Sequence, residues 1–205
     1  MTEQEKLTTI AENVPKVFEN GKRDGRREAY DAFWDAYQYR GGRRSYQYAF
    51  AGAGWTDETY NPKYDIVCSG GITSMFYYAK ITDTKVTIDL SGITTSNHAF
   101  STLTDLVTIR KLIVSETTPY LSTTFQSLNA LENMIIEGTI GQNGFNVSWS
   151  TKLSHDSLMS IINALQDKTT DTSGTSWVCT LGTENLAKLT DEEKLVATRK
   201  GWSLA

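Results

Sequence analysis

The sequence predicts an α/β protein whose middle part is a short solenoid, a stack of similar coils, with helices before it and an α/β cap after it. Two observations lead to this prediction. A phenylalanine recurs at intervals of 24 and 25 residues, at Phe76, Phe100 and Phe125. After each one, apolar residues follow in a ladder. A fixed period of roughly 20–50 residues indicates stacked units, because one unit cannot bury its own apolar face.

The first segment of the chain is predicted to be helical. Leu7, Ile10, Val14 and Val17 follow one another at spacings of three, four and three residues. This pattern suits an amphipathic helix or the seam of a coiled coil, so we expect a helix through which copies of the chain could associate. Pro15 interrupts the pattern and predicts a kink.

A second helix is predicted over residues 28–38, where four aromatic residues share one face. They are Tyr30, Phe33, Trp34 and Tyr37. The stripe could stack on a sugar, although packing on the repeats is the favoured interpretation. A Gly- and Tyr-rich connector follows over residues 45–65, and its Trp55 and Tyr60 are candidates for a contact patch or for cap packing.

The two regular copies of the repeat agree position by position, so equivalent side chains are expected to stack into one core. The matched pairs are Leu103 with Leu128, Leu106 with Leu131, and Ile109 with Met134. The copy after Phe76 is looser, with Ile81, Val86, Ile88 and Leu90 as its apolar residues.

The last part of the chain predicts a cap. Ser154 is placed to begin a helix, and Thr190 with Glu193 forms the pattern of a capping box for another. Strands are expected from Trp177 to Leu181 and from Trp202 to Leu204. We therefore divide the chain into an N-terminal segment (1–65), repeats of about three to four coils (66–150) and a capping segment (151–205).

The segments AFSTLTDLVTIRKLIV and TFQSLNALENMIIEG resemble the BspA-like leucine-rich repeats of bacteria and their phages. The front, VPKVFENGKRDGRREAYDAFWDAYQ, and the closing segment resemble proteins of gut Firmicutes and their prophages. The resemblance implies a right-handed leucine-rich-repeat solenoid with one short strand per coil, used for adhesion or recognition. It implies no active site.

Charge and hydropathy argue against a nucleic-acid partner and against insertion into a membrane. Residues 45–205 carry eleven basic and sixteen acidic side chains, so we expect no nucleic-acid partner, which would need a basic surface. The N-terminus is polar, and no apolar stretch approaches the length of a membrane span, so we expect neither a signal peptide nor membrane insertion. The protein would then be virion-associated if phage-encoded, and otherwise cytoplasmic or at the cell surface by another route.

Catalytic chemistry is not indicated. The two cysteines, Cys68 and Cys179, lie in apolar contexts and are expected to be buried thiols. A Cys–His–Asp site with His155 and Asp156 can be written, but neighbouring helical side chains diverge by about 100°. No phosphate-binding, zinc-protease or hydrolase motif occurs. We expect no enzyme activity, no cofactor and no metal.

Two functions remain as hypotheses. The first is a non-enzymatic binding or scaffold protein of a phage or prophage virion, such as a tail or receptor-recognition component. The alternative is a cell-surface or secreted adhesion module that binds a host protein or a glycan. A hydrolase would need a pocket with convergent polar groups, and nothing in the sequence predicts one.

Overall fold

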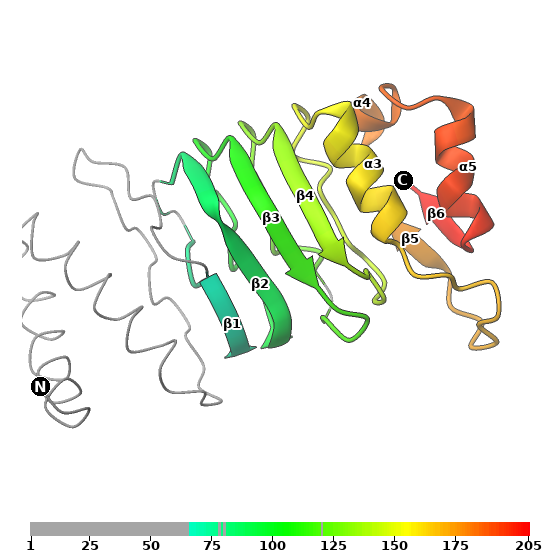
Figure 1. Ribbon diagram of the computed structural model, residues 1–205, viewed down its shortest axis with the longest axis horizontal. Helices are drawn as coiled ribbons and strands as arrows, with labels where there is room; N and C mark the ends of the chain where they lie inside the picture. Colours follow the sequence, from blue (N-terminus) through cyan, green and yellow to red (C-terminus); the bar gives the residue numbers. More distant parts are fainter. Residues whose placement is uncertain (1–65, 78, 80, 120) are drawn as a thin grey trace, which may run out of the picture. The chain divides into compact units, whose positions relative to one another are not determined.

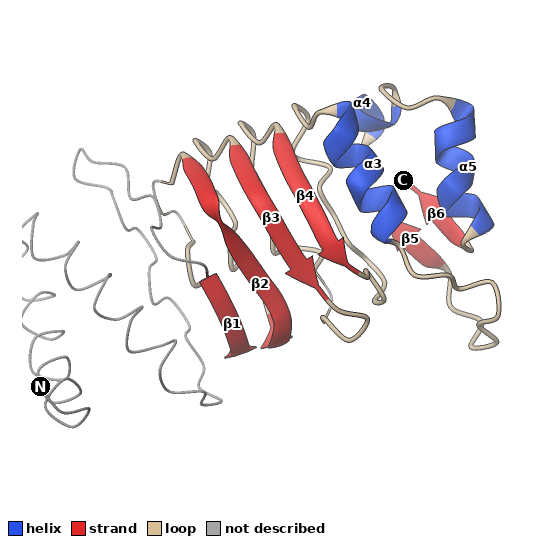
Figure 2. Ribbon diagram, in the orientation of Figure 1, coloured by secondary structure: helices blue, strands red, loops and turns tan. Residues whose placement is uncertain are grey.

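The structure is a computed structural model that describes residues 66–77, 79, 81–119 and 121–205, with the backbone alone at residues 69 and 83–86. These residues belong to one compact unit. Among the described residues, four strands come first, and helices and two short strands alternate after them (Figures 1 and 2). The elements are β1 (Ile66–Gly71), β2 (Asp83–Thr95), β3 (Thr108–Val114), β4 (Asn133–Gly138), α3 (His155–Ala164), β5 (Trp177–Cys179), α4 (Thr183–Leu186), α5 (Asp191–Arg199) and β6 (Trp202–Leu204).

The predicted fold class is wrong. A right-handed leucine-rich-repeat solenoid with N-terminal helices was expected, whereas the described residues form a mixed α/β fold. One parallel sheet has the order β1-β2-β3-β4, and a separate two-stranded sheet pairs β5 with β6. The apolar period gives the spacing and register of successive parallel strands. The series of parallel strands ends at β4, and the next element along the chain is α3 (Figure 1). The predicted N-terminal helices lie outside the described residues.

The strands of the larger sheet pair in the register that the apolar ladder predicts. Ile109 lies opposite Met134, which confirms that predicted match, and Leu112 lies opposite Ile136. Ile88 of β2 continues the second row. In β3 and β4 the buried residues alternate with more exposed ones, so one sheet face is packed on the core and the other faces outward.

Phenylalanine rings from successive connections contact one another in a column inside the fold. Ring centroids are 5.1 Å apart for Phe76 and Phe100, 6.0 Å for Phe100 and Phe125, and 6.0 Å for Phe125 and Phe145. All four rings are almost fully buried. Burial of one such ring stabilises the fold by about 1.5–3 kcal/mol, and contact between rings adds about 0.5–1.5 kcal/mol. The column of rings therefore packs each connection against the next one.

Hydrogen bonds tie the phenylalanine-bearing turns to one another. The Phe76 amide donates to the Ala99 carbonyl at 2.7 Å, and the Phe100 amide donates to the Thr124 carbonyl at 3.0 Å. The buried Thr124 hydroxyl reaches the Ser96 carbonyl at 3.0 Å. The turns therefore repeat in register as the strands do, and these amide and hydroxyl groups are satisfied inside the fold. The buried Nδ1 of His98, in the turn before Phe100, has no hydrogen-bond partner among the described residues.

The capping signals in the last third of the chain are confirmed. Ser154 caps α3, and Thr190 and Glu193 form the capping box of α5. Gly201 ends α5 with φ of +80°, a backbone conformation that suits glycine. The strand expected at Trp202–Leu204 is β6, and it pairs with β5.

Candidate binding surface

The two cysteines offer no nucleophile. Both thiols are buried and free. Burial raises the pKa of Cys68 above its ordinary value, with a further contribution from the Asp89 charge, and it raises the pKa of Cys179 to about 12. A nucleophilic cysteine is one whose pKa is lowered, so the Cys–His–Asp site that the sequence allows is not supported.

His155 belongs to a contact between helix ends. Its Nε2 lies 2.8 Å from Oε1 of Glu193, while its Nδ1 lies 3.7 Å from Oδ1 of Asp156. Hydrogen bonds from the Thr190 amide and from His155 lower the pKa of Glu193. The imidazole is half exposed, and no nucleophile from the described residues joins it. The arrangement links α3 to α5 and has no catalytic partner.

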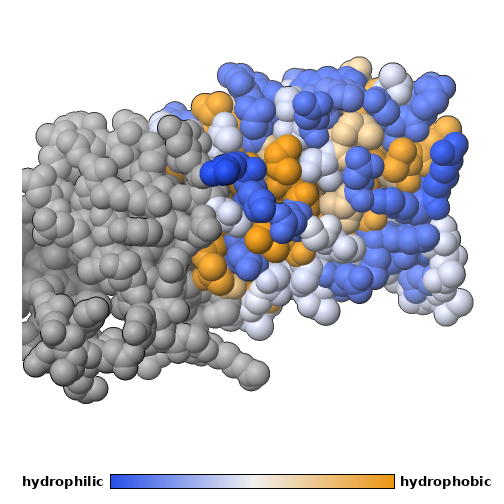
Figure 3. Space-filling view, viewed as in Figure 1, coloured by the Kyte–Doolittle hydropathy of each residue, from blue (hydrophilic) through white to orange (hydrophobic). Residues whose placement is uncertain are grey.

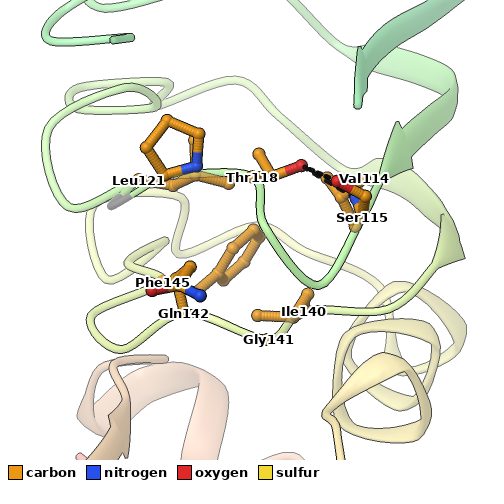
Figure 4. Close-up of a pocket in the computed structure, with 9 residues that line it drawn as sticks. Val114, Ser115, Thr118, Leu121, Ile140, Gly141, Gln142 and Phe145 are labelled. Carbon is orange, nitrogen blue, oxygen red and sulfur yellow. Dashed lines mark hydrogen bonds between the residues drawn. The ribbon is translucent and has the colours of Figure 1, made fainter. Parts of the chain in front are cut away.

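A small cavity lies between the connections that follow β3 and β4. The ring of Phe145 projects into it, and Leu121 and Ile140 line its walls (Figure 4). Two polar groups in its lining bond to each other, because the Thr118 hydroxyl accepts a hydrogen bond from the Ser115 amide at 2.8 Å. A volume of about 10 Å³ holds at most one water molecule, so this cavity admits no substrate.

The described part of the chain holds neither a metal-binding cluster nor a membrane-spanning helix. No three or more His, Cys, Asp or Glu side chains there come together in a way that could hold a metal ion. Among the described helices, none has the length and apolar character needed to cross a membrane.

The outward face of the four-stranded sheet carries exposed side chains of mixed character. One row crosses all four strands in register, from Val67 through Asp89 and Ile113 to Glu137. Ile135 stands beside this row on β4. Val67 is 47% exposed and Ile135 is 44% exposed. Figure 3 shows hydrophobic and hydrophilic residues side by side over this part of the molecule.

An ion pair crosses the same face. Lys111 of β3 contacts Glu137 of β4, and both side chains remain about half exposed. Asp89 accepts a hydrogen bond from the Ser91 amide at 2.9 Å, which fixes its carboxylate at the surface. We call these six residues the outer sheet face: Val67, Asp89, Lys111, Ile113, Ile135 and Glu137. The aliphatic residues of this face have charged neighbours, and protein interfaces likewise have an apolar centre with a polar rim.

The predicted site residues lie elsewhere. The repeat anchors are structural and almost fully buried: Phe76, Phe100, Phe125, Leu106, Leu131, Ile109 and Met134. The predicted oligomer helix (Leu7, Ile10, Val14 and Val17) and the contact patch (Trp55 and Tyr60) lie outside the described residues.

The apolar ladder does not predict the outer sheet face, because the ladder contains only the buried positions of each strand. The available signal was the period of two within each strand, which sends the residues between ladder positions outward. Ile113, between the buried Leu112 and Val114, is one of these outward residues. A single outward aliphatic residue is common, so the informative signal is that several of them fall on one face of the sheet.

Comparison with known protein families, curated proteins and solved structures finds no match to this chain.

Proposed function

We propose that this protein is a non-enzymatic binding protein and that its outer sheet face binds a protein ligand. The observation that supports the proposal is the row of outward side chains that crosses the four strands in register, from the exposed Val67 to Glu137. The exposed Ile135 lies beside this row, as does the ion pair between Lys111 and Glu137. Sites on strands are positioned more accurately than sites on loops, which favours recognition.

A protein ligand suits this face better than a glycan does. Sugar rings stack on flat aromatic side chains, whereas the outer sheet face presents branched aliphatic groups. Trp177, in the cap, is not open for stacking, because the Lys168 ammonium lies 4.0 Å from its ring centroid. Its indole nitrogen also donates to Asp171 at 2.6 Å. Aliphatic centres with charged surroundings match the anatomy of protein–protein contacts.

The size of the face predicts weak binding by a single copy. Four strands about 4.8 Å apart and about six residues long cover roughly 300 Å². A standard interface buries about 800 Å² on each partner, so one face binds weakly and several linked faces bind much more tightly. The virion setting expected from the N-terminal helix stays a prediction, because that helix lies outside the described residues.

Two variants with equally exposed sites test the proposal. Ile135 on the sheet and Leu195 on α5 are each 44% exposed. The wild type, Ile135→Glu and Leu195→Glu are applied to a displayed library of protein domains and to a glycan array, and the affinity of each hit is measured. We expect protein ligands with micromolar dissociation constants, binding at least tenfold weaker for Ile135→Glu, and unchanged binding for Leu195→Glu.

Three results would count against the proposal. Binding to glycans alone would replace the protein ligand with a carbohydrate. Equal loss of protein binding in both variants would indicate nonspecific adhesion, and unchanged binding of Ile135→Glu would place the contact elsewhere.

A further inference from the structure

One asparagine side chain takes the place of a neighbouring strand at the start of β5. The Nδ2 of Asn143 donates to the Ser176 carbonyl at 3.0 Å, and its Oδ1 accepts from the Val178 amide at 2.8 Å. The Gly144 amide donates to the Val178 carbonyl at 3.1 Å. Two adjacent residues therefore satisfy three backbone groups at the start of β5.

The same junction continues beyond Asn143 with backbone groups alone. The Thr180 amide donates to the Phe145 carbonyl at 2.8 Å, and the Val147 amide donates to the Thr180 carbonyl at 2.9 Å. The pairing here is that of two parallel strands, as the bridge between Asn146 and Thr180 also shows. Only the beginning of the junction therefore depends on a side chain, and that side chain is Asn143.

Asn143 is followed by glycine, and an asparagine–glycine pair is chemically reactive. The Gly144 backbone nitrogen can attack the carbonyl carbon of the Asn143 side chain, because glycine has no Cβ to obstruct the approach. A carbon–nitrogen bond forms, ammonia leaves and a succinimide ring results. Water then opens the ring at either of its carbonyl groups. The product is aspartate, or isoaspartate, in which the main chain runs through the former side-chain carbon.

The fold holds both reacting groups away from this reaction. The attacking Gly144 nitrogen must lose its proton, which the structure places in the hydrogen bond to the Val178 carbonyl. The Asn143 carboxamide must turn away from Ser176 and Val178, to which it is bonded. We propose that Asn143 is a site of spontaneous deamidation, that pairing with β5 protects it, and that deamidation irreversibly loosens the start of β5.

The products of the reaction cannot rebuild this junction. An aspartate side chain at position 143 can still accept from the Val178 amide, but its second oxygen has no proton to donate to the Ser176 carbonyl. Isoaspartate lengthens the main chain by one carbon and displaces the Gly144 amide from its acceptor. The bonds between Phe145 and Thr180 use backbone groups only, so the loosening is confined to the start of β5. The site lies apart from the outer sheet face and does not depend on the proposed binding function.

The first test follows two asparagines in one sample of the full-length wild type. Asn146 is the internal control, because the branched side chain of the following Val147 hinders ring closure. The protein is incubated at mildly alkaline pH, folded or in urea, and peptide mass spectrometry locates each new carboxylate. We expect Asn143 to convert at least about tenfold more slowly in the folded protein than in urea, because the junction must open first. Asn146 should remain an amide in both samples.

Equal conversion rates of Asn143 in the folded protein and in urea would overturn the protection by β5. An Asn143 that is no more reactive than Asn146 in urea would overturn the modification site itself.

The second test compares Asn143→Asp, which reproduces one product, with Asn146→Asp. The Asn146 Oδ1 accepts from the Ser148 amide at 3.0 Å and from the Ser148 hydroxyl at 2.9 Å, and a carboxylate oxygen can accept both bonds. Hydrogen exchange is measured at the Val178 and Thr180 amides. We expect Asn143→Asp to speed exchange of the Val178 amide at least about tenfold and to leave the Thr180 amide unchanged.

The control Asn146→Asp should keep the wild-type exchange rate at both amides. Wild-type exchange of the Val178 amide in Asn143→Asp would overturn the loosening of β5. Equal acceleration of both amides in the two variants would also contradict it, because the effect would then not be specific to the Asn143 side chain.

Discussion

At the scale of single residues, the buried phenylalanines are the features that most strongly determine the packing. Phe100 lies in the middle of the ring column, with Phe76 on one side at 5.1 Å and Phe125 on the other at 6.0 Å. Its side chain is 1% exposed. Because it has ring neighbours on both sides, its loss leaves a cavity that neither neighbour can fill without leaving its own contacts.

We therefore predict that Phe100→Ala lowers the free energy of unfolding by about 3–5 kcal/mol. Val107→Ala is the control, because Val107 is 37% exposed and its truncation should change stability by no more than about 0.5 kcal/mol. Urea unfolding followed by circular dichroism measures both variants. Similar small losses for the two would show that the ring column does not determine the stability of the fold.

Glu193 predicts a pH dependence of stability. Its pKa is lowered in the folded protein by hydrogen bonds from the Thr190 amide and from His155. A lowered carboxyl pKa gives stability that is present above the unfolded pKa of about 4.3 and is lost as the pH falls through the folded pKa. Glu193→Gln should therefore be less stable than the wild type at neutral pH, and the difference should shrink below about pH 4.

Unfolding midpoints measured from about pH 3 to pH 7 test this expectation, with Glu192→Gln on the exposed side of the same helical turn as the control. A gap between the wild type and Glu193→Gln that stays constant over this range would mean that the carboxylate charge is not what stabilises the contact between α5 and α3.

At the scale of elements, the ends of the strands depend on close backbone approach. Gly138 ends β4 with φ of +94°, and a Cβ atom there would lie 2.0 Å from the Val114 carbonyl oxygen. Gly174 also has a positive φ, +75°, but a Cβ atom there would meet nothing within 4 Å. The two glycines separate the effect of backbone conformation from the effect of a steric clash.

We expect Gly174→Ala to cost about 1–2 kcal/mol through its backbone conformation alone. Gly138→Ala should cost clearly more, because the carbonyl of β3 must move and the pairing of the two strand ends is disturbed. Thermal unfolding of the two variants compares them directly. Equal losses of stability would mean that β3 and β4 are not held as closely at this end as the structure indicates.

The helix ends and the strand register were predictable from the sequence, whereas the outer sheet face was not. The side chains of Ser154, Thr190 and Glu193 bond to backbone groups only three residues away, so the local sequence contains the whole capping pattern. The register of Ile109 with Met134 followed from the apolar period. The hydroxyl contacts from α3 to β4 were not foreseen, because a serine in a helix gives no sign of whether it faces a strand edge.

At the scale of the whole molecule, the periodic pattern led to the wrong fold class. Equal spacing of buried residues is shared by stacked coils and by any parallel sheet with connections of similar length, so the pattern alone does not distinguish them. The chain ends its parallel sheet at β4, covers that edge with α3 and continues into a separate two-stranded sheet. The result is one outward-facing surface of four strands paired in register.

The central claim is that this outer sheet face binds a protein ligand. The most direct measurement compares the covalent labelling of two exposed ion pairs, Lys111 with Glu137 on the sheet and Lys194 with Asp191 on α5. Mass spectrometry follows the labelling with and without a ligand selected from the library. We predict that the ligand slows labelling of Lys111 and Glu137 and leaves Lys194 and Asp191 unchanged. Protection of the α5 pair with no change on the sheet would contradict the claim.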